Sequence, residues 1–330
     1  MNDTPLLQVQ NLKQYFPIRA GVLRKIVDWV KAVDGVSFEV SPGETLGVVG
    51  ESGCGKSTLG MSIMRLYEPT EGKVFFQGQE ISSLQSSQLK NIRRDIQMIF
   101  QDPFTSLDPR MHVGPIIEEG MKVHHLASLP EIRRRALDLL EKVGLGAEYF
   151  SRYPHEFSGG QRQRIGIARA LALSPRLIVA DEPVSSLDVS VRSQILNLLK
   201  DLKKEYQLTY IFISHDLAVV RQVCNRVMVM YLGKVVEIAE GEVFFSTPYH
   251  PYSVALISAV PVPDPDYEVK RIILSGDVPS PINPPEGCRF HTRCPVAQEI
   301  CQQVEPVLEQ KEKNHWVACH FPGSLSYKGQ

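Results

Sequence analysis

The chain has 330 residues, of which 43% are hydrophobic, and its formal net charge is −1. This is ample for a large core and long enough for one large domain plus a smaller one. The near-zero charge gives no overall basic field, so we expect no nucleic-acid partner. No stretch approaches the ~20 consecutive apolar residues of a membrane-spanning helix. The first ten residues also lack the basic start and apolar run of a signal peptide, so we expect a cytoplasmic chain.

In chain order, the first part of the sequence predicts strands and turns. Residues 5–18 and 31–49 have alternating apolar positions, which predict β-strands. Residues 19–30 between them predict an insertion or a hairpin. The segment 45–49 is a short apolar run, and residues 56–66 after it predict a helix.

The middle of the chain predicts a helical insert followed by alternating helices and strands. Residues 110–157 have a mainly helical pattern, with Gly144 suited to a helix C-terminus. One apolar helix face contains Ile132, Ala136, Leu139, Leu140 and Val143. Residues 158–240 alternate helix and strand again. We therefore expect an α/β fold with a largely parallel sheet and a helical subdomain at about 102–175.

The character of the sequence changes after Gly241. Seven prolines lie between Pro261 and Pro285, so this stretch is a poor candidate for regular structure. A compact Cys-rich tail follows it. We therefore divide the chain into residues 1–240 and a C-terminal extension, residues 241–330.

The clearest chemical signal is residues 50–58, GESGCGKST, which fit G-x-x-x-x-G-K-[ST] and lie between a predicted strand and a predicted helix. The glycines let backbone N–H groups curl around phosphate oxygens, and the helix N-terminus favours an anion. Lys56 is expected to reach the β- and γ-phosphates, and the Ser57 hydroxyl to bind Mg²⁺. The residues expected to contact the nucleotide are Gly50, Ser52, Gly53, Cys54, Gly55, Lys56, Ser57 and Thr58.

A second group of polar residues follows apolar strands. Asp181 ends the run LIVAD, where a carboxylate that supports Mg²⁺ belongs in P-loop enzymes, and Glu182 is placed to orient or deprotonate a water. Gln101 and His215 each follow another apolar strand. Because the carboxyl ends of parallel strands share one edge of a sheet, these residues and the glycine loop can converge on one nucleotide.

A third signal, SGGQ at residues 158–161, precedes a helical pattern. Ser158 and Gln161 form an S-x-x-Q capping box, which would start a helix with no function attached. Gly159 and Gly160 would also open the N-terminus of that helix to an anion. The local pattern leaves both interpretations open.

Together these motifs resemble the nucleotide-binding subunit of ABC transporters, over nearly all of residues 6–330. The matching segments are the P-loop 50–58, the Q-loop glutamine Gln101, the signature 158–161, the Walker B segment 177–182, the D-loop 186–188 and the switch histidine His215. Phe157 and Ser186 replace a commoner leucine and alanine, which are mild departures. The resemblance implies a P-loop ATPase fold with a mainly parallel core sheet, an antiparallel β subdomain, a helical insert and a small Cys-rich extension.

The family also implies a dimer in which two ATP molecules are buried between subunits. The signature of one subunit, Ser158, Gly159, Gly160 and Gln161, would then face the P-loop of the other. By the same resemblance, Glu182 is the general base, His215 holds the γ-phosphate, and Gln101 links Mg²⁺ and water to the membrane partner.

Two further site assignments rest on the resemblance. Asp188 of the D-loop belongs to the nucleotide site. An aromatic residue near the amino terminus stacks on adenine in this family, and Phe16 aligns best with it, with Tyr15 as the alternative.

More specific features are similar to the oligopeptide/dipeptide subfamily. They are residues 100–109 (FQDPFTSLDP), residues 249–252 (YHPY) leading to 259–261, and the Cys-rich extension. The resemblance implies the ATP-hydrolysing subunit of a peptide importer, peripheral to the cytoplasmic face of the inner membrane. Its implied partners are a paralogous ATPase or a second copy of itself, two membrane permeases and, indirectly, an extracytoplasmic peptide-binding protein. The chain resembles the second ATPase of such a pair.

Two alternatives to peptide import stay open. Importers of nickel or glutathione share the same ATPase pattern. The other is a soluble ABC ATPase that acts on ribosomes or DNA, and the single ATPase unit and the lack of a coiled coil argue against it.

The cysteines of the tail form a separate candidate site. Cys288, Cys294, Cys301 and Cys319 have the spacing C-x5-C-x6-C-x17-C, which lacks the paired C-x-x-C of common zinc sites. Some members of the subfamily carry an iron–sulfur cluster on a similar tail, and four thiolates are what a [4Fe–4S] cluster needs. The alternatives are reduced thiols, or zinc with substitute ligands from His291, His315 and His320.

Overall fold

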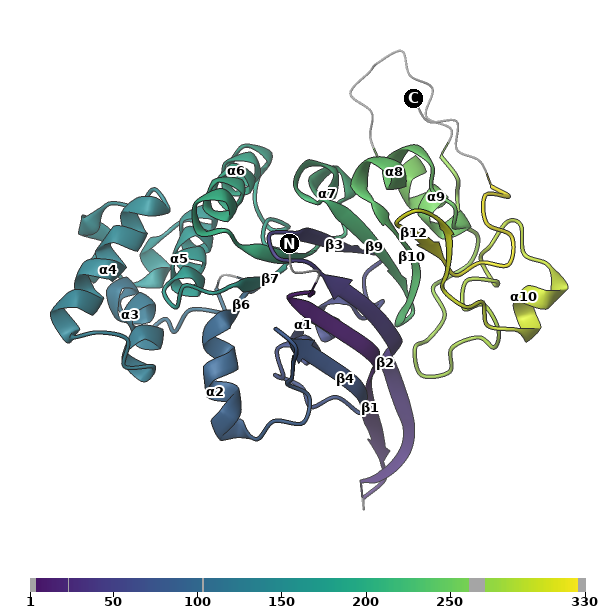
Figure 1. Ribbon diagram of the computed structural model, residues 1–330, viewed down its shortest axis with the longest axis horizontal. Helices are drawn as coiled ribbons and strands as arrows, with labels where there is room; N and C mark the ends of the chain where they lie inside the picture. The colour runs from purple at the N-terminus through teal and green to yellow at the C-terminus, as the bar shows by residue number, and fades with distance from the viewer. Residues whose placement is uncertain (1–3, 23, 103, 261–270, 326–330) are drawn as a thin grey trace, which may run out of the picture. The chain divides into compact units, whose positions relative to one another are not determined.

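The computed structural model describes residues 4–22, 24–102, 104–260 and 271–325 (Figure 1). The chain forms two compact units, and each is assembled from segments that are separate in the sequence. The first unit contains Met1–Ser41, Thr45–Ser83 and Ser214–Gln330, and the second contains Pro42–Glu44 and Leu84–Ile213.

One sheet of the first unit is antiparallel, with strand order β2-β1-β4-β5. Its strands are β1 (Leu7–Ala20), β2 (Lys25–Val40), β4 (Glu71–Phe76) and β5 (Gln79–Glu80). The strands β1 and β2 pair out to Ala20 and Lys25, which confirms a hairpin in residues 19–30. The long pairing of β1 with β2 gives this unit its extended arm (Figure 1).

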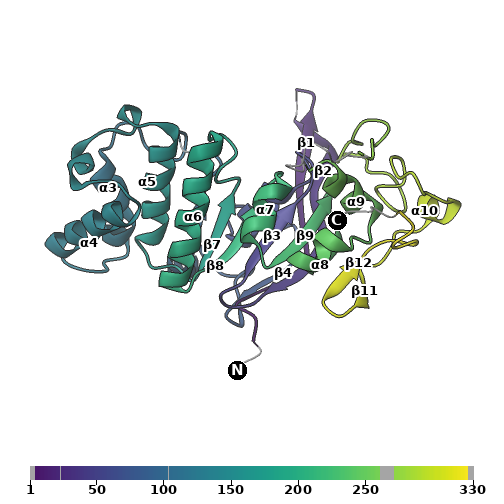
Figure 2. The same cartoon turned by 90° about the horizontal axis from the view of Figure 1, so that it is seen from above.

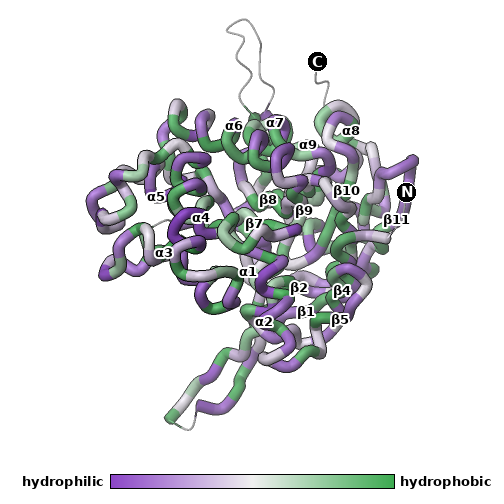
Figure 3. The backbone as a smooth tube through the Cα atoms, turned by 60° about the vertical axis from the view of Figure 1, so that its left-hand side comes forward, coloured by the Kyte–Doolittle hydropathy of each residue, from purple (hydrophilic) through white to green (hydrophobic). Residues whose placement is uncertain are grey.

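The other strands of the first unit run in the order β11-β12-β10-β9-β3. They are β3 (Thr45–Val49), β9 (Arg226–Tyr231), β10 (Lys234–Glu240), β11 (Glu309–Glu312) and β12 (His315–Val317). The pair β3–β9 is parallel, whereas β9–β10, β10–β12 and β11–β12 are antiparallel. Every residue of β3 is buried, as expected for an apolar run without alternation. The buried strand β9 carries the hydrophobic colour in Figure 3.

The C-terminal extension adds short helices to this unit rather than a separate core. The helices of the first unit are α1 (Lys56–Ile63), α7 (Leu217–Val223), α8 (Gly241–Ser246), α9 (Pro251–Ser258) and α10 (Glu299–Gln303). Phe244, Tyr252 and Phe290 of the extension pack with Val229 and Tyr231 of β9 in one buried cluster. The extension therefore shares its core with the strands that precede it. In Figure 2, α8 and α9 lie near β9.

The second unit has three parallel strands in the order β8-β7-β6. They are β6 (Ile96–Ile99), β7 (Leu177–Asp181) and β8 (Thr209–Ile213). Its helices are α2 (Ser86–Asp95), α3 (Val113–Val123), α4 (Leu129–Lys142), α5 (Gly159–Leu171) and α6 (Val189–Tyr206), with short 3₁₀ turns at Ala147–Ser151 and Pro154–Glu156. The helices α3, α4 and α5 lie side by side in Figures 1 and 2.

The helical insert follows its sequence pattern closely. The apolar face predicted for α4 is buried, with Ala136 and Leu140 fully inaccessible to solvent. Gly144 adopts a φ of 75° just after the helix, the left-handed conformation that favours glycine there. Both expectations for this helix are therefore confirmed.

The proline-rich stretch contains no helix or strand in its described part, residues 271–285, and residues 261–270 lie outside the described residues. Pro103 and Pro261, which belong to the family-like segments 100–109 and 259–261, also lie outside them. No described helix has both the length and the hydropathy needed to cross a membrane.

Candidate functional site

The glycine loop after β3 has the backbone that its sequence predicts. Gly50, Gly53 and Gly55 have φ values of 149°, 79° and 101°, a range that side chains rarely adopt. A Cβ atom on Gly55 would lie 1.9 Å from the carbonyl oxygen of Ala32. The loop is therefore a tight turn that ends at the N-terminus of α1, the arrangement that binds phosphate in P-loop proteins.

The side chain of Lys56 is folded back into this loop. Lys56 is 5% exposed, and its Nζ donates to the carbonyl oxygens of Gly50 (2.7 Å) and Glu51 (2.9 Å). The loop is also fixed from the β9–β10 turn, where the Gly233 N–H donates to the Cys54 carbonyl at 2.9 Å. These contacts hold the ammonium of Lys56 within the glycine loop, beside the N-terminus of α1.

Cys54 lies in the same loop but is buried rather than reactive. Burial raises the pKa of its thiol, and its Sγ lies 3.7 Å from Nζ of Lys56. Cys54 is 3% exposed, and its backbone N–H donates to the Glu51 carbonyl at 3.4 Å, so the nucleotide contact predicted for Cys54 stays a prediction.

The second unit brings two of the predicted catalytic residues into contact. Nε2 of Gln101 donates to Oε2 of Glu182 at 3.0 Å, because β6 and β7 are parallel neighbours and both residues follow the same ends. Asp181, the last residue of β7, is 3% exposed. The parallel-strand argument is confirmed for this pair.

Glu182 has an unusual backbone conformation. Its φ is 44°, in the left-handed region, and its N–H donates to the Ile213 carbonyl at 2.9 Å. The carbonyl of Glu182 accepts from the hydroxyl of Ser185 at 3.1 Å. A non-glycine residue in this region costs on the order of 1–3 kcal/mol, and such strain clusters at functional sites.

His215 follows Ser214, a residue that contacts β3 in the first unit. The N–H of the preceding Ser214 donates to the carbonyl of Val48 at 3.1 Å, two residues before Gly50. The predicted switch histidine therefore enters the same unit as the glycine loop.

The SGGQ segment starts α5 as a full capping box. The Ser158 side chain accepts from the N–H of Gln161 at 3.3 Å, and Oε1 of Gln161 accepts from the N–H of Ser158 at 3.0 Å. A Cβ on Gly160 would lie 2.4 Å from Cγ1 of Val191, so this glycine also lets α5 approach α6. Asp188 of the D-loop caps α6 by accepting from the Val191 N–H at 2.9 Å. These contacts confirm the structural interpretation of the segment, and its partner-facing role stays a prediction.

Comparison with known proteins decides the family. The ABC transporter model matches residues 33–185, and the model of the oligopeptide/dipeptide transporter C-terminal region matches residues 236–301. The chain is 54% identical over 323 residues to the oligopeptide transport ATP-binding protein AppF of Bacillus subtilis, covering 97% of this chain and 98% of that protein. The chain belongs to the ABC transporter family.

Two further matches agree with this. The putative peptide import ATP-binding protein BOV_A0347 of Brucella ovis is 50% identical, with 97% of this chain and 98% of that protein covered. The dimeric post-hydrolysis structure of the ATP-binding cassette MJ0796, bound to ADP and Pi, matches with a TM-score of 0.64 at 31% identity, covering 71% of this chain and 98% of that chain. The predicted fold is therefore confirmed, and the chain is an ABC-type ATPase.

Both adenine-stacking candidates of this ABC ATPase lie on β1, in the same unit as the glycine loop. The hydroxyl of Tyr15 donates to Oδ1 of Asp34 at 2.5 Å, and Tyr15 is held in that network. Phe16 is partly buried and meets Tyr67 edge to face, with ring centroids 5.2 Å apart. Which ring stacks on adenine stays a prediction, with Phe16 as the first candidate and Tyr15 as the alternative.

This assignment has a direct test in nucleotide binding. Phe16→Ala is expected to weaken ATP binding about tenfold, because stacking of a base on an aromatic ring contributes roughly 1–3 kcal/mol. Inorganic tripolyphosphate, which has no base, is expected to bind Phe16→Ala as it binds the wild type. Titration of both ligands against both proteins measures this. Loss of ATP affinity in Tyr15→Ala with no loss in Phe16→Ala would assign the stacking to Tyr15 instead.

The four cysteines of the ABC ATPase extension are buried or partly buried. Among the described residues, no group of three or more His, Cys, Asp or Glu side chains is arranged to hold a metal ion. Burial raises the pKa of Cys288 to about 11 and that of Cys319 to about 12, and it also raises the pKa of Cys294. Cys301 is 6% exposed. The predicted iron–sulfur site finds no support among the described residues.

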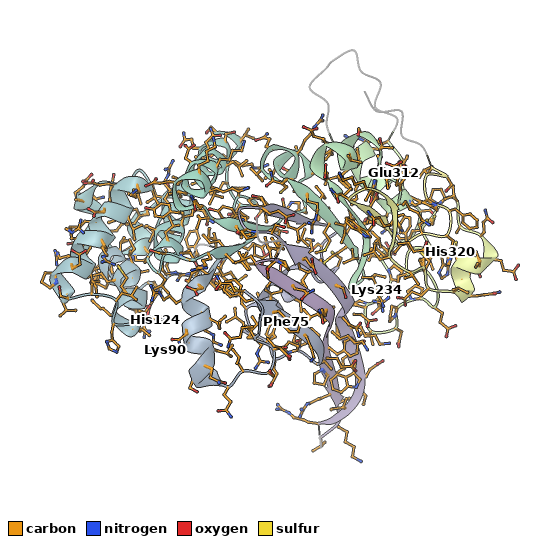
Figure 4. The ribbon with its side chains drawn as sticks, in the orientation of Figure 1. Phe75, Lys90, His124, Lys234, Glu312 and His320 are labelled. Atoms are coloured by element: carbon orange, nitrogen blue, oxygen red, sulfur yellow. The ribbon has the colours of Figure 1, made fainter. Side chains whose placement is uncertain are left out.

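The histidines named as substitute zinc ligands have other partners. Nε2 of His315 lies 2.7 Å from Oε1 of Glu237, and both side chains are buried. Nδ1 of His291 lies 2.9 Å from the Cys288 carbonyl oxygen, and Nε2 of His320 lies 2.8 Å from the Val304 carbonyl oxygen (His320 is labelled in Figure 4). Sequence spacing could not foresee these contacts, because they depend on the tertiary fold.

Sequence reasoning missed two residues beside the glycine loop of this ABC ATPase. Tyr252 and Arg293 of the extension both contact Glu51, from 201 and 242 residues away in the chain. In the sequence, Tyr252 is part of the family-like segment 249–252. No local pattern signals such distant contacts, although an aromatic and an arginine in an otherwise loop-rich tail are natural candidates for them.

Proposed function

We propose that the chain is the ATP-hydrolysing subunit that energises a membrane importer of peptides. The observation that carries the proposal is the pairing, in one chain, of a formed phosphate loop around Lys56 with a C-terminal region of the oligopeptide/dipeptide transporter type. Two relatives, one of Bacillus subtilis and one of Brucella ovis, bear oligopeptide transport or peptide import names over almost their full length. The proposed location is the cytoplasmic face of the inner membrane, as a peripheral subunit.

In the proposed site, each residue has a distinct task. The glycine loop and Lys56 bind the phosphates of ATP by backbone N–H groups and a positive charge. Ser57, Asp181 and Gln101 would hold Mg²⁺, which offsets phosphate charge when bound. Glu182 takes a proton from the attacking water, oriented by its contact with Gln101.

The proposed working form is a dimer of ATPase subunits. The signature residues Ser158–Gln161 of one subunit contact the γ-phosphate on the other, as does His215 from its own side. ATP binding bridges the two subunits, and hydrolysis removes the bridge. The dimeric cassette structures of MJ0796 support a dimer as the form to test. The partner is a paralogous ATPase, with this chain as the second of the pair, or a second copy of this chain.

The proposed assembly also contains two permeases and, indirectly, an extracytoplasmic peptide-binding protein. The permeases convert closing and reopening of the ATPase dimer into alternating access.

The division of the chain into residues 1–240 and an extension at 241–330 remains a prediction. The helical subdomain at about 102–175 also remains a prediction.

The choice of cargo is tested with the chain in its native membrane system. A strain without this gene is expected to lose uptake of labelled di- and oligopeptides and to regain it with the wild-type gene. Uptake of nickel and of glutathione, measured in the same strains, is expected to stay unchanged. Loss of nickel or glutathione uptake with peptide uptake intact would replace the peptide proposal with that alternative. Intact uptake of all three would favour a soluble ABC ATPase.

The finer cofactor prediction, a [4Fe–4S] cluster on the four tail cysteines, has its own test. What supports it is that Cys288, Cys294, Cys301 and Cys319, the four thiols that such a cluster needs, all lie within residues 288–319. Iron and sulfide are measured after anaerobic purification of the full chain. About four irons per chain would support the cluster. An iron-free protein with four titratable thiols would favour reduced cysteines without a cluster.

A further inference from the structure

Two side chains of the C-terminal extension end on one residue of the phosphate loop, Glu51. The backbone N–H of Glu51 donates to the hydroxyl of Tyr252 at 2.8 Å. Nη1 of Arg293 donates to Oε2 of Glu51 at 2.8 Å. The loop is therefore held at both its backbone and its side chain by residues outside the P-loop motif.

Both contacts come from well-buried, closely packed groups. Tyr252 is fully buried, and the side chain of Arg293 is 9% exposed. The ring of Tyr252 packs against Tyr231 at 4.8 Å and against Phe290 at 5.3 Å between centroids, and Tyr231 packs edge to face on Phe290 at 5.2 Å. A cluster of three buried aromatic rings moves little, so it presents a fixed hydroxyl to the loop.

The contacts on Glu51 continue to the lysine that meets phosphate. The carbonyl of Glu51 accepts from Nζ of Lys56 at 2.9 Å. The N–H, the carboxylate and the carbonyl of Glu51 are thus all engaged, by Tyr252, Arg293 and Lys56 in turn. These contacts restrain the backbone and the side chain of Glu51. Because the Glu51 carbonyl accepts from Lys56, the extension also helps to fix the position of the Lys56 ammonium before ATP binds.

A second arginine of the extension contacts β2, the strand that pairs with β1 and its adenine candidates. Arg289 is buried and bonds both the carboxylate of Asp34 and the carbonyl of Leu232. The same carboxylate accepts from the hydroxyl of Tyr15 at 2.5 Å. Lys234, labelled in Figure 4, adds ion pairs to Asp34 at 3.7 Å and to Glu305 at 2.7 Å. The extension therefore contacts two separate segments of the first unit, the glycine loop at Glu51 and β2 at Asp34.

We infer that the C-terminal extension is a working part of the ATP site, in which Arg293 and Tyr252 are positioning residues that preorganise the phosphate loop through Glu51. This inference rests on the proposed function, since it takes the loop to bind ATP. Preorganisation lowers the free-energy cost of ordering the loop when the nucleotide binds. Loss of these contacts is therefore expected to weaken ATP affinity. It predicts that the extension serves nucleotide binding in addition to any other role.

The test measures ATP binding and steady-state ATP turnover with variants of the full chain. Arg293→Gln and Tyr252→Phe are each expected to raise the Kd and the KM for ATP about tenfold, the size expected when one buried or charge-assisted hydrogen bond is lost. The kcat at saturating ATP is expected to change less than about twofold, because neither residue touches the reacting atoms. Circular dichroism at the assay temperature confirms that each variant is folded.

Three comparisons separate positioning from general destabilisation. Lys311→Gln breaks an exposed ion pair with Glu309 (2.8 Å) in the same extension and is expected to bind ATP as the wild type does. Arg293→Lys keeps a positive charge beside Glu51 and is expected to recover part of the affinity. Glu51→Gln combined with Arg293→Gln is expected to cost less than the sum of the two single changes, since both remove one contact.

The outcomes distinguish this inference from the proposed function. A wild-type chain that binds no ATP would overturn the proposed function and this inference with it. A wild-type chain that binds ATP, with folded Arg293→Gln and Tyr252→Phe variants that bind it equally well, would overturn the inference alone. Additive effects of the Glu51 and Arg293 changes would also contradict it, because the loss would then not pass through their contact.

Discussion

Replacing Glu182 with glutamine is expected to lower ATP turnover about 100-fold or more while ATP binding stays intact. The carboxylate follows β7, where Nε2 of Gln101 donates to it, and it is proposed to take the proton of the attacking water. Glutamine has the same shape but cannot accept that proton at neutral pH. The contact with Gln101 survives the change through the amide oxygen, so the local geometry is retained.

The same variant is expected to stabilise the ATP-bound dimer. Without hydrolysis the bridging γ-phosphate remains, and size-exclusion chromatography with ATP is expected to show the dimer. Glu141→Gln, an isosteric change at an exposed position of α4, serves as the matched control and is expected to keep wild-type turnover. Normal hydrolysis by Glu182→Gln would show that the general-base assignment is wrong.

Lys56→Met is expected to weaken ATP binding by about 10- to 100-fold, because it removes charge-assisted hydrogen bonds to the phosphates. Methionine fills a similar volume and leaves no buried charge behind, so the fold is expected to survive. Isothermal titration with ATP measures the affinity, and the melting temperature without ATP checks the fold.

The matched control for this change is Lys313→Met, at an exposed turn in the same unit. It is expected to bind ATP as the wild type does. Equal ATP affinity in Lys56→Met and the wild type would contradict the assignment of the loop as the phosphate site. The control also excludes an effect of the overall charge change.

Sequence pattern predicted the local features of this chain well. The capping box of Ser158 and Gln161 depends on residues three apart, and the left-handed Gly144 depends on the end of one helix. The tight glycine loop at residues 50–58 is likewise fixed by its own glycines and the helix that follows. Such features are visible in sequence because their causes are local.

Other features could not be predicted, because their causes lie far apart in the chain. The left-handed φ of Glu182 violates local preference and is imposed by the fold around it. The contact of Arg293 with Glu51 joins two segments through a shared aromatic core. The four tail cysteines have the right number for a cluster, but spacing alone cannot say whether their sulfurs surround a common point. In the structure, Cys301 is buried and the other three are partly buried.

The most direct measurement of the central claim is ATP turnover by the purified chain, first alone and then in lipid with its paralogous ATPase and permeases. We expect turnover to be low for the chain alone and to rise in the full assembly. We expect Glu182→Gln to lower turnover about 100-fold or more in both cases. Rapid turnover by the chain alone, unchanged by the membrane partners and stimulated by ribosomes or DNA, would contradict the central claim.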